Sequence, residues 1–239
     1  MTRVRADDYD TKKKTIIGKA AALIARKGFD GATMMDVANA CGTSKSHIYH
    51  YFPSKEDLLY EIVHDHITRQ AADLERIVAL PVPAEERFTR FVESFIRVAA
   101  RERDEHIMLM NDLKFLPRAK LQAIRRLEVR LTDMLVDLLR EINPELMAAE
   151  RVRKPYALLL FGMMIWTLSW FHRAGPIAPK ELARRIAHLF VHGFRAPPPD
   201  LDALPDDASA RSMSSRATTL SASVSSAPSK MESTRASTK

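Results

Sequence analysis

The first fifty residues alternate short helical patterns with turn signals. From about Thr11 to Lys27, apolar residues recur at the spacing of one helical face. Gly28 follows directly after a basic pair, which is typical of a helix C-terminus, because glycine readily adopts the left-handed conformation that ends many helices. Residues 1–11 carry mixed charges and no apolar stripe, so we expect a loose arm there.

Two shorter helices follow the first. Thr33, with Asp36 three residues later, resembles a capping box and predicts the start of a second helix that ends before Gly42. Ser44 can cap a third helix of about eight residues, which Pro53 ends. The pattern therefore predicts a helix, a glycine-containing turn and a short helix in close succession.

The sequence up to Phe194 continues as longer helical patterns whose boundaries are marked by prolines. Glycine is scarce, with only seven in 239 residues, and helix-forming residue types dominate. We expect these helices at about 54–78, in three stretches between 84 and 142, at about 148–173 and at 179–194. With the first three, this predicts an all-α protein of about nine helices.

The sequence changes character after Phe194. It continues as APPPD and then as a stretch rich in serine, alanine and threonine, without aromatic residues, as far as Lys239. Such a composition buries too little apolar surface to offset the entropy of folding. We therefore expect residues 196–239 to be a disordered tail.

Charge and cysteine content narrow the functional classes. The net charge of +7 favours an anionic partner, without choosing between nucleic acid, a membrane surface and an anionic small molecule. The single cysteine allows no disulfide framework and no cysteine-based zinc site within one chain, and it fits a cytoplasmic location. The charged N-terminus lacks the apolar segment of a secretory signal.

The predicted third helix is unusually polar. The stretch SKSHIYHYF contains two serines, a lysine, two histidines and two tyrosines, and only Ile48 and Phe52 are plainly apolar. These two residues share one helix face at i and i+4 and can anchor the helix, so the polar side chains can point outward. A helix, a glycine turn and a short polar helix form the pattern of a helix-turn-helix, whose second helix enters the major groove of DNA.

The segment TMMDVANACGTSKSHIYHYFPSKEDLL resembles the signature of the tetracycline-repressor (TetR) family. The matching positions are Thr33, Ala38, Gly42, Ser44, Tyr49, Tyr51, Phe52, Lys55 and Leu58. Thr43, Ser46 and His47 depart from the usual family pattern, so we expect the operator preference to depend on Ser46 and His47. The resemblance implies a three-helix DNA-binding domain at 1–56 and a helical ligand-binding and dimerisation domain at 57–195, ahead of the tail.

The resemblance also implies DNA contacts by position, with Lys45, Ser46 and His47 in base-reading places. Tyr51 fits a core position equally well, Phe52 is expected in the core, and the Lys12–Lys14 run is either a phosphate-contacting arm or a solvated helix start. The full set of expected DNA-binding residues is Thr33, Thr43, Ser44, Lys45, Ser46, His47, Tyr49, His50, Tyr51 and Lys55.

The C-terminal half suggests an effector. The segments MNDLKFLP and LLLFGMMIWTLSWFHRAG resemble the C-terminal half of TetR regulators of fatty-acid or aromatic-acid degradation that respond to acyl-coenzyme A thioesters. Their large apolar residues fit a plain core as well. An apolar pocket would take the acyl group, and basic side chains would hold the phosphates. The expected ligand-binding residues are Met110, Asn111, Lys114, Phe115, Arg118, Met163, Trp166 and Trp170.

The resemblance to the TetR family implies a homodimer that pairs through the last two helices, and the sequence suits that role. The helix around 156–171 is apolar nearly all round and needs cover on more than one side, which a two-fold partner supplies. A dimer would present two recognition helices to a palindromic operator, about one turn of DNA apart. The expected interface residues are Leu182, Ile186, Leu189 and Phe190.

Other classes of function fit the sequence less well. His188 and His192 at i and i+4 could share a metal, but no third ligand lies nearby in sequence, so we expect no metal and no other cofactor. Catalytic motifs such as a nucleophile elbow or a phosphate loop are absent from the sequence, so we expect no enzyme. A membrane-surface protein is the remaining rival, because the basic charge and the apolar run permit it, but the helix-turn-helix signature does not call for it. The longest apolar run is also shorter than the roughly 20 residues that span a bilayer, so we expect a buried core helix there. A TetR-type regulator with another hydrophobic effector, or with none, is the nearer alternative.

Overall fold

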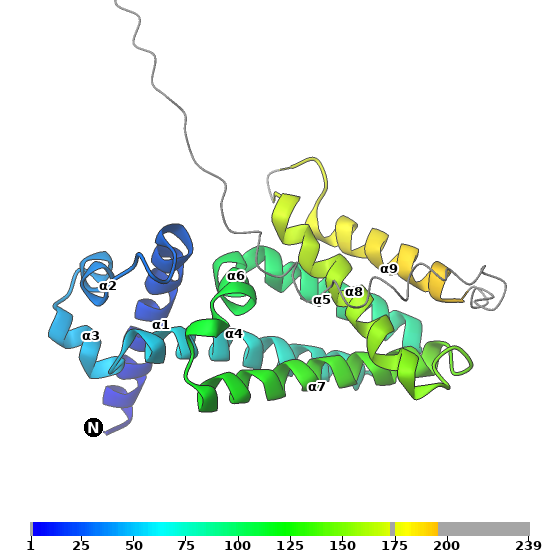
Figure 1. Cartoon of the computed structure of the whole chain (residues 1–239), viewed down its shortest axis with the longest axis horizontal. Coiled ribbons are helices and arrows are strands. Elements are labelled where there is room, and N and C mark those ends of the chain that lie inside the picture. The colour runs from blue at the N-terminus through cyan, green and yellow to red at the C-terminus, as the bar shows by residue number, and fades with distance from the viewer. Residues whose placement is uncertain (1, 173–174, 196–239) are drawn as a thin grey trace, which may run out of the picture. The chain divides into compact units, whose positions relative to one another are not determined.

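The computed structural model describes the backbone of residues 2–172 and 175–195, and the side chains from Tyr9 onward within these ranges. In this part of the chain every regular element is a helix, which confirms the all-α prediction and its nine α-helices (Figure 1). The elements are α1 Thr2–Lys27, α2 Met34–Cys41, α3 Lys45–Tyr51, α4 Lys55–Val78, α5 Ala84–Arg101, α6 Arg103–Asn111, the 3₁₀ turn η1 Leu113–Phe115, α7 Arg118–Ile142, α8 Glu150–Trp170 and α9 Pro179–Arg195. The predicted tail at 196–239 lies outside the described residues.

Side-chain caps define α2 and α3 as the sequence predicts. The Thr33 hydroxyl accepts a hydrogen bond from the Asp36 backbone N–H at 3.1 Å, and the Asp36 carboxylate accepts one from the Thr33 backbone N–H at 3.0 Å. Gly42 ends α2 with φ 67°, a conformation that suits a residue without Cβ. The Ser44 hydroxyl then accepts from the His47 backbone N–H at 3.1 Å and starts α3.

The first helix is longer than its apolar pattern predicts. It begins at Thr2, so the loose arm expected at residues 1–11 is wrong. No glycine or proline interrupts the sequence before Gly18, and therefore the helix continues beyond its buried stripe into polar residues. Tyr9 on this extension stacks on Tyr51 of α3, with 4.7 Å between ring centroids.

Helix α5 lies at the centre of the C-terminal bundle. It packs against α4, α7, α8 and α9, and α4 lies beside α7 along much of its length (Figure 1). The buried apolar residues form one continuous cluster from Ile16 in α1 to Phe194 in α9. Because α4 contributes to this cluster throughout its length, the proposed domain boundary at residue 56 stays a prediction.

The apolar stripe of α9 faces α5 of the same chain. Leu182 and Ile186 are each 6% exposed, and Phe190 stacks on Phe88 of α5 with 5.7 Å between ring centroids. These three residues therefore belong to the intrachain core, and their predicted place in a dimer interface stays a prediction. Leu189, the fourth predicted interface residue, is 66% exposed and stays accessible.

Helix α8 leaves an apolar stripe uncovered. Leu159, Met163, Trp166 and Trp170 follow one another at spacings of four, three and four residues, so they share one side of the helix. All four are exposed, and Trp166 is exposed to 70%. A Cβ added at Gly162, near the middle of this stripe, would meet no atom within 4 Å apart from its chain neighbours and the backbone of its own helix. The stripe is thus an open apolar surface with room for close approach.

A chain of hydrogen-bonded polar side chains connects α4 with α6 inside the core. His66 Nδ1 donates to the Glu102 carboxylate at 2.9 Å, and His66 Nε2 lies 3.2 Å from His106 Nδ1. His66 is fully buried, and His106 is 2% exposed. Arg69 adds a 2.9 Å ion pair to the other oxygen of Glu102. The carboxylate at the solvent side of the core thus fixes the orientation of two buried imidazoles.

The surroundings shift two pKa values in this chain. The hydrogen bond from His66 is the largest cause that lowers the pKa of Glu102 to about 2, opposed by burial and assisted by Arg101 and Arg69. Burial lowers the pKa of His106 to about 3, and the charge of His66 lowers it further. Both groups therefore keep their neutral-pH protonation states, carboxylate and neutral imidazole, far into acid.

We predict acid destabilisation from the polar chain. Below pH 6.5 His106 binds a proton in the unfolded chain, whereas in the folded chain it stays neutral until about pH 3. The contribution of His106 to the free energy of unfolding is therefore fully present above pH 6.5 and decreases as the pH falls toward 3. The slope from this residue reaches at most about 1.4 kcal/mol per pH unit. The contribution of Glu102 to the free energy of unfolding is present above pH 4.5 and is lost as the pH falls toward about 2.

Urea unfolding at a series of pH values tests this expectation. His106→Gln is expected to flatten the dependence of the unfolding free energy between pH 6.5 and 4.5, whereas Glu102→Gln is expected to act below 4.5. An unchanged slope between pH 6.5 and 4.5 in His106→Gln contradicts the prediction.

Candidate nucleic-acid interface and effector cavity

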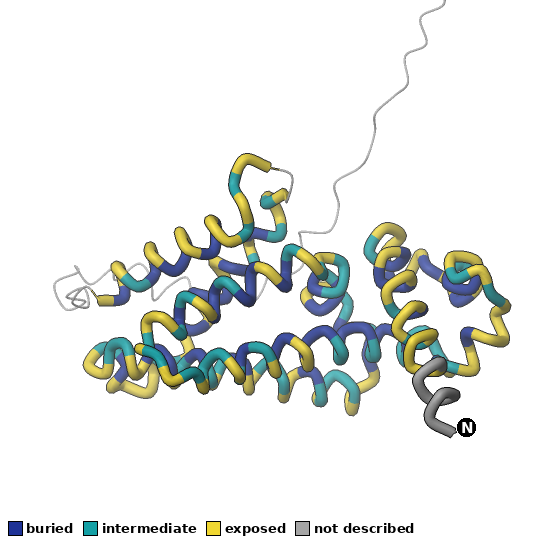
Figure 2. The backbone as a smooth tube through the Cα atoms, turned by 180° about the vertical axis from the view of Figure 1, so that it is seen from behind, coloured by how far each residue is buried: buried dark blue, intermediate teal, exposed yellow. Residues whose placement is uncertain are grey.

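Helix α3 presents its polar face to solvent. Ile48 is fully buried and Phe52 is 1% exposed, so the two apolar residues anchor the helix as the spacing predicts. Between and around them, exposed positions follow one another along the outer side of α3 (Figure 2). The exposed residues are Ser44, Lys45, Ser46, His47, Tyr49 and His50. Thr43 and Tyr51 are half-buried.

Aromatic contacts order the exposed side chains of α3. The Lys45 ammonium lies over the Tyr49 ring, 5.6 Å from its centroid. His47 and His50 both meet the Tyr51 ring edge to face, at 5.2 and 5.5 Å. Tyr51 is itself stacked on Tyr9 of α1. Tyr51 is therefore half-packed and supports the two histidines, and its predicted contact with DNA stays a prediction.

The start of α2 carries a stabilised carboxylate. A hydrogen bond from the Lys27 ammonium is the largest cause that lowers the pKa of Asp36 to about 2, and bonds from the Thr33 backbone and hydroxyl add to it. Thr33 is exposed, but its hydroxyl already donates to Asp36 at 2.9 Å. It can still accept a hydrogen bond, whereas a phosphate contact through its own proton would compete with the cap.

Two lysines expected to contact DNA, one in the predicted DNA-binding set and one in the Lys12–Lys14 run, bind partners within the protein. The Lys55 ammonium donates to the carbonyl oxygens of Phe29 and Ala32 at 2.8 and 3.0 Å and lies 4.3 Å from the Phe29 ring centroid. Lys13 pairs with Glu61 at 2.7 Å. Lys55 thus ties the start of α4 to the turn before α2, an internal role that sequence position alone did not indicate.

The predicted ligand-binding residues are not gathered around one cavity. Asn111, Lys114 and Arg118 are exposed, and Phe115 stacks on Phe29 near the helix-turn-helix at 4.5 Å between ring centroids. Met163, Trp166 and Trp170 belong to the exposed stripe of α8. Of the eight, Met110 alone lines the apolar cavity described next. The spacing of large apolar residues did not distinguish the outer face of a helix from its inner face.

An apolar cavity of about 230 Å³ lies within the bundle and is lined by α4, α5, α6, α7 and α8. Phe95 and Phe161 contribute aromatic wall, with 5.6 Å between their ring centroids. Gln70 and His106 line it as buried polar groups, each 2% exposed. Arg125, which is exposed, lines the cavity as its basic residue and pairs with Glu128 at 2.7 Å. The site is therefore a mostly apolar pocket, open to solvent on one side, with a few polar contacts, as small-molecule sites have.

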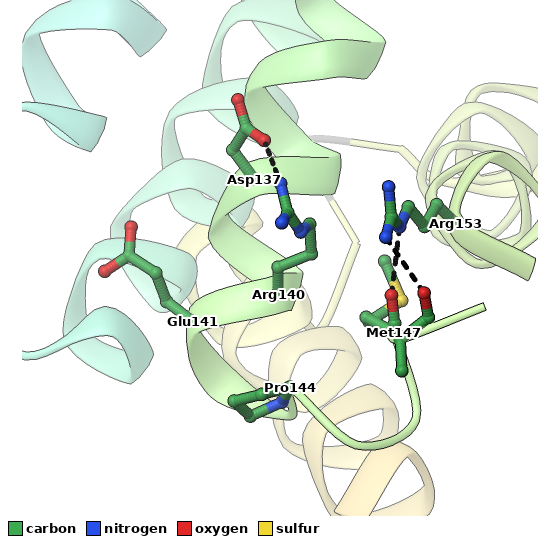
Figure 3. Close-up of a pocket in the computed structure, with 7 residues that line it drawn as sticks. Asp137, Arg140, Glu141, Pro144, Met147 and Arg153 are labelled. Atoms are coloured by element: carbon green, nitrogen blue, oxygen red, sulfur yellow. Dashed lines mark hydrogen bonds and ion pairs between the residues drawn. The ribbon is translucent and has the colours of Figure 1, made fainter. Parts of the chain in front are cut away.

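A larger pocket of about 410 Å³ at the end of α7 has a different character (Figure 3). Its charged residues include Asp137, Arg140, Glu141 and Arg153. Arg140 pairs with Asp137, and Arg153 donates to the carbonyl oxygens of Met147 and Ala148 at 3.0 and 2.9 Å. Its arginines already have partners in the fold, so this pocket offers little reason to bind an apolar effector.

Metal and thiol chemistry find no assembled site in the described part of the chain. The rings of His188 and His192 lie 4.0 Å apart, but no group of three candidate metal ligands occurs within these residues. Burial raises the pKa of the half-buried Cys41, which makes its thiol less reactive. None of the described helices is long and apolar enough to cross a bilayer.

The sequence interpretation missed the polar groups of the cavity. His66, Gln70 and His106 occupy inward positions of otherwise apolar stripes. A polar residue in register with a buried stripe is the signal that could have identified them, because burial without a partner is costly.

The sequence matches two models of one regulator family. Residues 16–62 match the model described as bacterial regulatory proteins, tetR family, and residues 81–194 match the tetracyclin repressor-like C-terminal domain. The first match contains α2 and α3 completely. The second contains α5 to α8 and nearly all of α9.

Known proteins agree with both matches. A TetR-family transcriptional regulator from Bordetella parapertussis 12822 is 31% identical, covers 74% of this chain and 93% of its own, and superposes with a TM-score of 0.72. The transcriptional repressor KstR2 of Mycolicibacterium smegmatis is 23% identical over 77% of this chain and 91% of its own. AibR, solved with isovaleryl coenzyme A and operator DNA, shares the fold at 21% identity and a TM-score of 0.66, over 74% of this chain and 97% of its own. By these matches and by its helix-turn-helix geometry, the chain belongs to the TetR family of transcriptional regulators.

Proposed function

We propose that the protein is a homodimeric repressor that binds a palindromic operator through α3 and is released by a small apolar effector. The observation that carries the proposal is the exposed polar face of α3, anchored by the buried Ile48 and Phe52. Lys45, Ser46 and His47 lie in its first turn, where recognition helices contact base edges. The protein would act in the cytoplasm, where bacterial DNA is located.

The phosphate contacts fall on the surrounding exposed polar groups. Ser44, Tyr49 and His50 offer hydroxyl and imidazole donors beside the base-reading positions. Thr33 and Thr43 extend this surface toward α2, and Tyr51 acts by holding the two histidines. Lys55 has a positioning role in the proposal, because its ammonium is bonded within the protein.

The exposed stripe of α8 supports the dimer. Tryptophan is the residue type most often found at the energetic centre of protein interfaces, and this stripe carries two. With Leu189 of α9, it gives a partner chain an apolar surface that water otherwise solvates at a cost. A two-fold axis through such a surface would pair identical stripes.

The effector proposal rests on the cavity among α4–α8. The volume of about 230 Å³ suits the acyl end of a thioester, and the exposed Arg125 offers a charge for the anionic remainder. The isovaleryl coenzyme A bound to AibR is a precedent within the fold. An effector that is hydrophobic but not a thioester fits the apolar wall equally well.

Contacts between the bundle and the helix-turn-helix offer a path for release. Helix α6, which lines the cavity, leads into η1, whose Phe115 stacks on Phe29. Phe29 in turn lies under the Lys55 ammonium at the start of α4. An effector that fits the cavity better when α6 is displaced would shift Phe115 and so change the position of α2 and α3. The coupling equals the effector's difference in affinity between the two states.

Substitutions in α3 test the DNA-binding assignment. Lys45→Ala is expected to weaken binding to all sequences and to lower the slope of log affinity against log salt by about one, because one phosphate or base cation is lost. His47→Ala is expected to relax the preference at one or two operator positions. Fluorescence anisotropy with the intergenic DNA upstream of the gene measures both. Lys180→Ala, at the exposed start of α9, is the control and should leave affinity unchanged.

Charge substitutions on α8 test the dimer. Trp166→Glu is expected to raise the dimer dissociation constant at least about 30-fold, because it removes an interfacial anchor and buries a charge. Val129→Glu, on the exposed surface of α7, is the matched control. Sedimentation velocity measures both, and a Trp166→Glu chain that stays dimeric would contradict the assigned interface.

Thioester titration of the operator complex tests the effector. At least one short-chain acyl-coenzyme A is expected to lower operator affinity by about tenfold or more, since typical coupling free energies correspond to such factors. The same titration with free coenzyme A controls for the nucleotide. Operator binding that no thioester changes would support the alternative, a TetR regulator with another effector or none.

A further inference from the structure

One aromatic residue stands in the charged first part of α1. Tyr9 is the first aromatic residue of the sequence, and the next is Phe29. The Tyr9 side chain is 40% exposed, so burial in the apolar core does not account for it. Its ring instead stacks on the ring of Tyr51 at the end of α3, with 4.7 Å between centroids and 25° between planes. The extension of α1 therefore contacts the helix that is proposed to read DNA.

Lys13 joins the same face of α1 to the residue that follows Tyr51. It comes four residues after Tyr9, and its ammonium lies over the Phe52 ring, 5.9 Å from the centroid. Lys13 also pairs with Glu61 of α4 at 2.7 Å. Two contacts one helical turn apart thus hold α1 against the end of α3, and they fix the place of the Tyr9 ring.

Tyr51 passes this support on to two imidazoles. His47 lies one turn before Tyr51 on the same face of α3 and meets its ring edge to face at 5.2 Å. His50 meets the Tyr51 ring edge to face at 5.5 Å and the Tyr9 ring at 6.3 Å. Among the ring contacts of Tyr51 in the described part of the chain, the stack with Tyr9 is the one that comes from outside residues 47–52. Tyr9 therefore ties this aromatic group to a second helix.

The orientation of these imidazoles matters for reading a sequence. Both histidines are exposed, and an exposed side chain that nothing holds changes rotamer within nanoseconds. A side chain that is held in one rotamer loses less conformational entropy on binding. His47 lies in the first turn of α3, where recognition helices contact base edges. A fixed imidazole presents its nitrogen atoms to one pattern of donors and acceptors and so separates one base pair from another.

We propose that Tyr9 is a specificity-determining residue for operator DNA that acts through Tyr51. The Tyr9 ring holds the Tyr51 ring in place, and that ring orients the two imidazoles of α3. Tyr9 is thus a positioning residue and needs no contact with DNA of its own. The energy of an aromatic pair corresponds to a factor of about three to ten in an equilibrium constant. This inference rests on the proposed function and adds a residue of α1 to those that determine operator preference.

NMR signals of the histidine rings in the free, full chain test the positioning without DNA. The ring current of Tyr51 shifts the signals of His47 and His50 away from those of a free imidazole. Tyr9→Ala is expected to move both signals toward the free position, whereas Tyr9→Phe keeps the stack and should leave them in place. Thr15→Ala is the control in the same helix, because Thr15 is exposed and its hydroxyl donates to the Thr11 carbonyl oxygen within α1 at 2.9 Å. Histidine signals that Tyr9→Ala leaves unchanged would overturn the proposal.

Selection of binding sites from randomised duplex DNA tests the effect on specificity. The base pairs whose preference is lost in His47→Ala are those that His47 reads. At these base pairs Tyr9→Ala is expected to lower discrimination about three- to tenfold. Affinity for unrelated DNA and the salt slope should stay unchanged, because no cation is removed. Tyr9→Phe is expected to keep the wild-type preference.

Two outcomes of the selection speak against a positioning role. An equal loss in Tyr9→Phe and Tyr9→Ala would indicate a direct contact of the hydroxyl group with DNA. Weaker binding to all DNA with an unchanged preference would indicate that Tyr9 only stabilises the fold. Either result would overturn the proposal. Where Tyr9→Ala does not fold, Tyr9→Leu takes its place, because it removes the stacked ring and keeps an apolar side chain.

A double variant tests the route through His47. In Tyr9→Ala with His47→Ala, discrimination at the base pairs read by His47 is expected to match that of His47→Ala alone, because nothing is left there for Tyr9 to position. Losses that add up would overturn the route.

The two measurements separate this inference from the proposed function. A wild-type chain that selects no DNA sequence overturns the proposed function and the specificity role with it, while the histidine signals still decide whether Tyr9 orders the imidazoles. Sequence-specific binding whose preference Tyr9→Ala leaves unchanged supports the proposed function and overturns this inference alone.

Discussion

The arrangement depends on α4 being one continuous helix that is buried at both ends. Its first turns pack Leu58, Leu59, Ile62 and Val63 into the core shared with α1, and its later turns pack Ile67, Ala71 and Leu74 into the bundle. A helix with an intact hydrogen-bond ladder resists bending, so displacement at one end is carried to the other. In the proposed function, α4 would therefore link recognition of DNA to occupation of the cavity, whatever the effector is.

Three buried polar side chains interrupt the apolar core around α4. The helical pattern predicts apolar side chains at the inward positions of α4 and α6, but three of these positions hold His66, Gln70 and His106. Burial of such polar groups costs free energy unless hydrogen-bond partners are present. Glu102 and Arg69 offset part of that cost for His66. Nε2 of Gln70 and Nε2 of His106 stay buried without a hydrogen-bond partner. Departures from local rules of this kind are typical of functional sites, where local stability is given up for recognition.

Local sequence signals predicted much of the fold. Caps at Thr33, Ser44 and Gly42 act over three or four residues, so the helix boundaries near them agree with the structure. The same reasoning failed at the start of α1, where nothing in the sequence stops the helix and a tertiary contact of Tyr9 supports its extension. Apolar periodicity identified buried stripes but could not say what covers them. For that reason Leu182, Ile186 and Phe190 were assigned to a partner chain, although α5 covers them, and the expected pocket residues of α8 are on its outer side. Interfaces, pockets and cores are built from the same large apolar residue types, so only the packing of segments that are distant in sequence shows which of the three a residue belongs to.

The uncovered stripe of α8 has a consequence for how the gene responds to the amount of its product. If two chains must pair through Trp166 and its neighbours before an operator is bound, occupancy at low abundance rises with roughly the square of the chain concentration, by mass action. Small changes in synthesis or degradation would then produce a threshold rather than a proportional response. The apolar surface that binds a second chain would thus also set the copy number below which the regulated genes are no longer silenced.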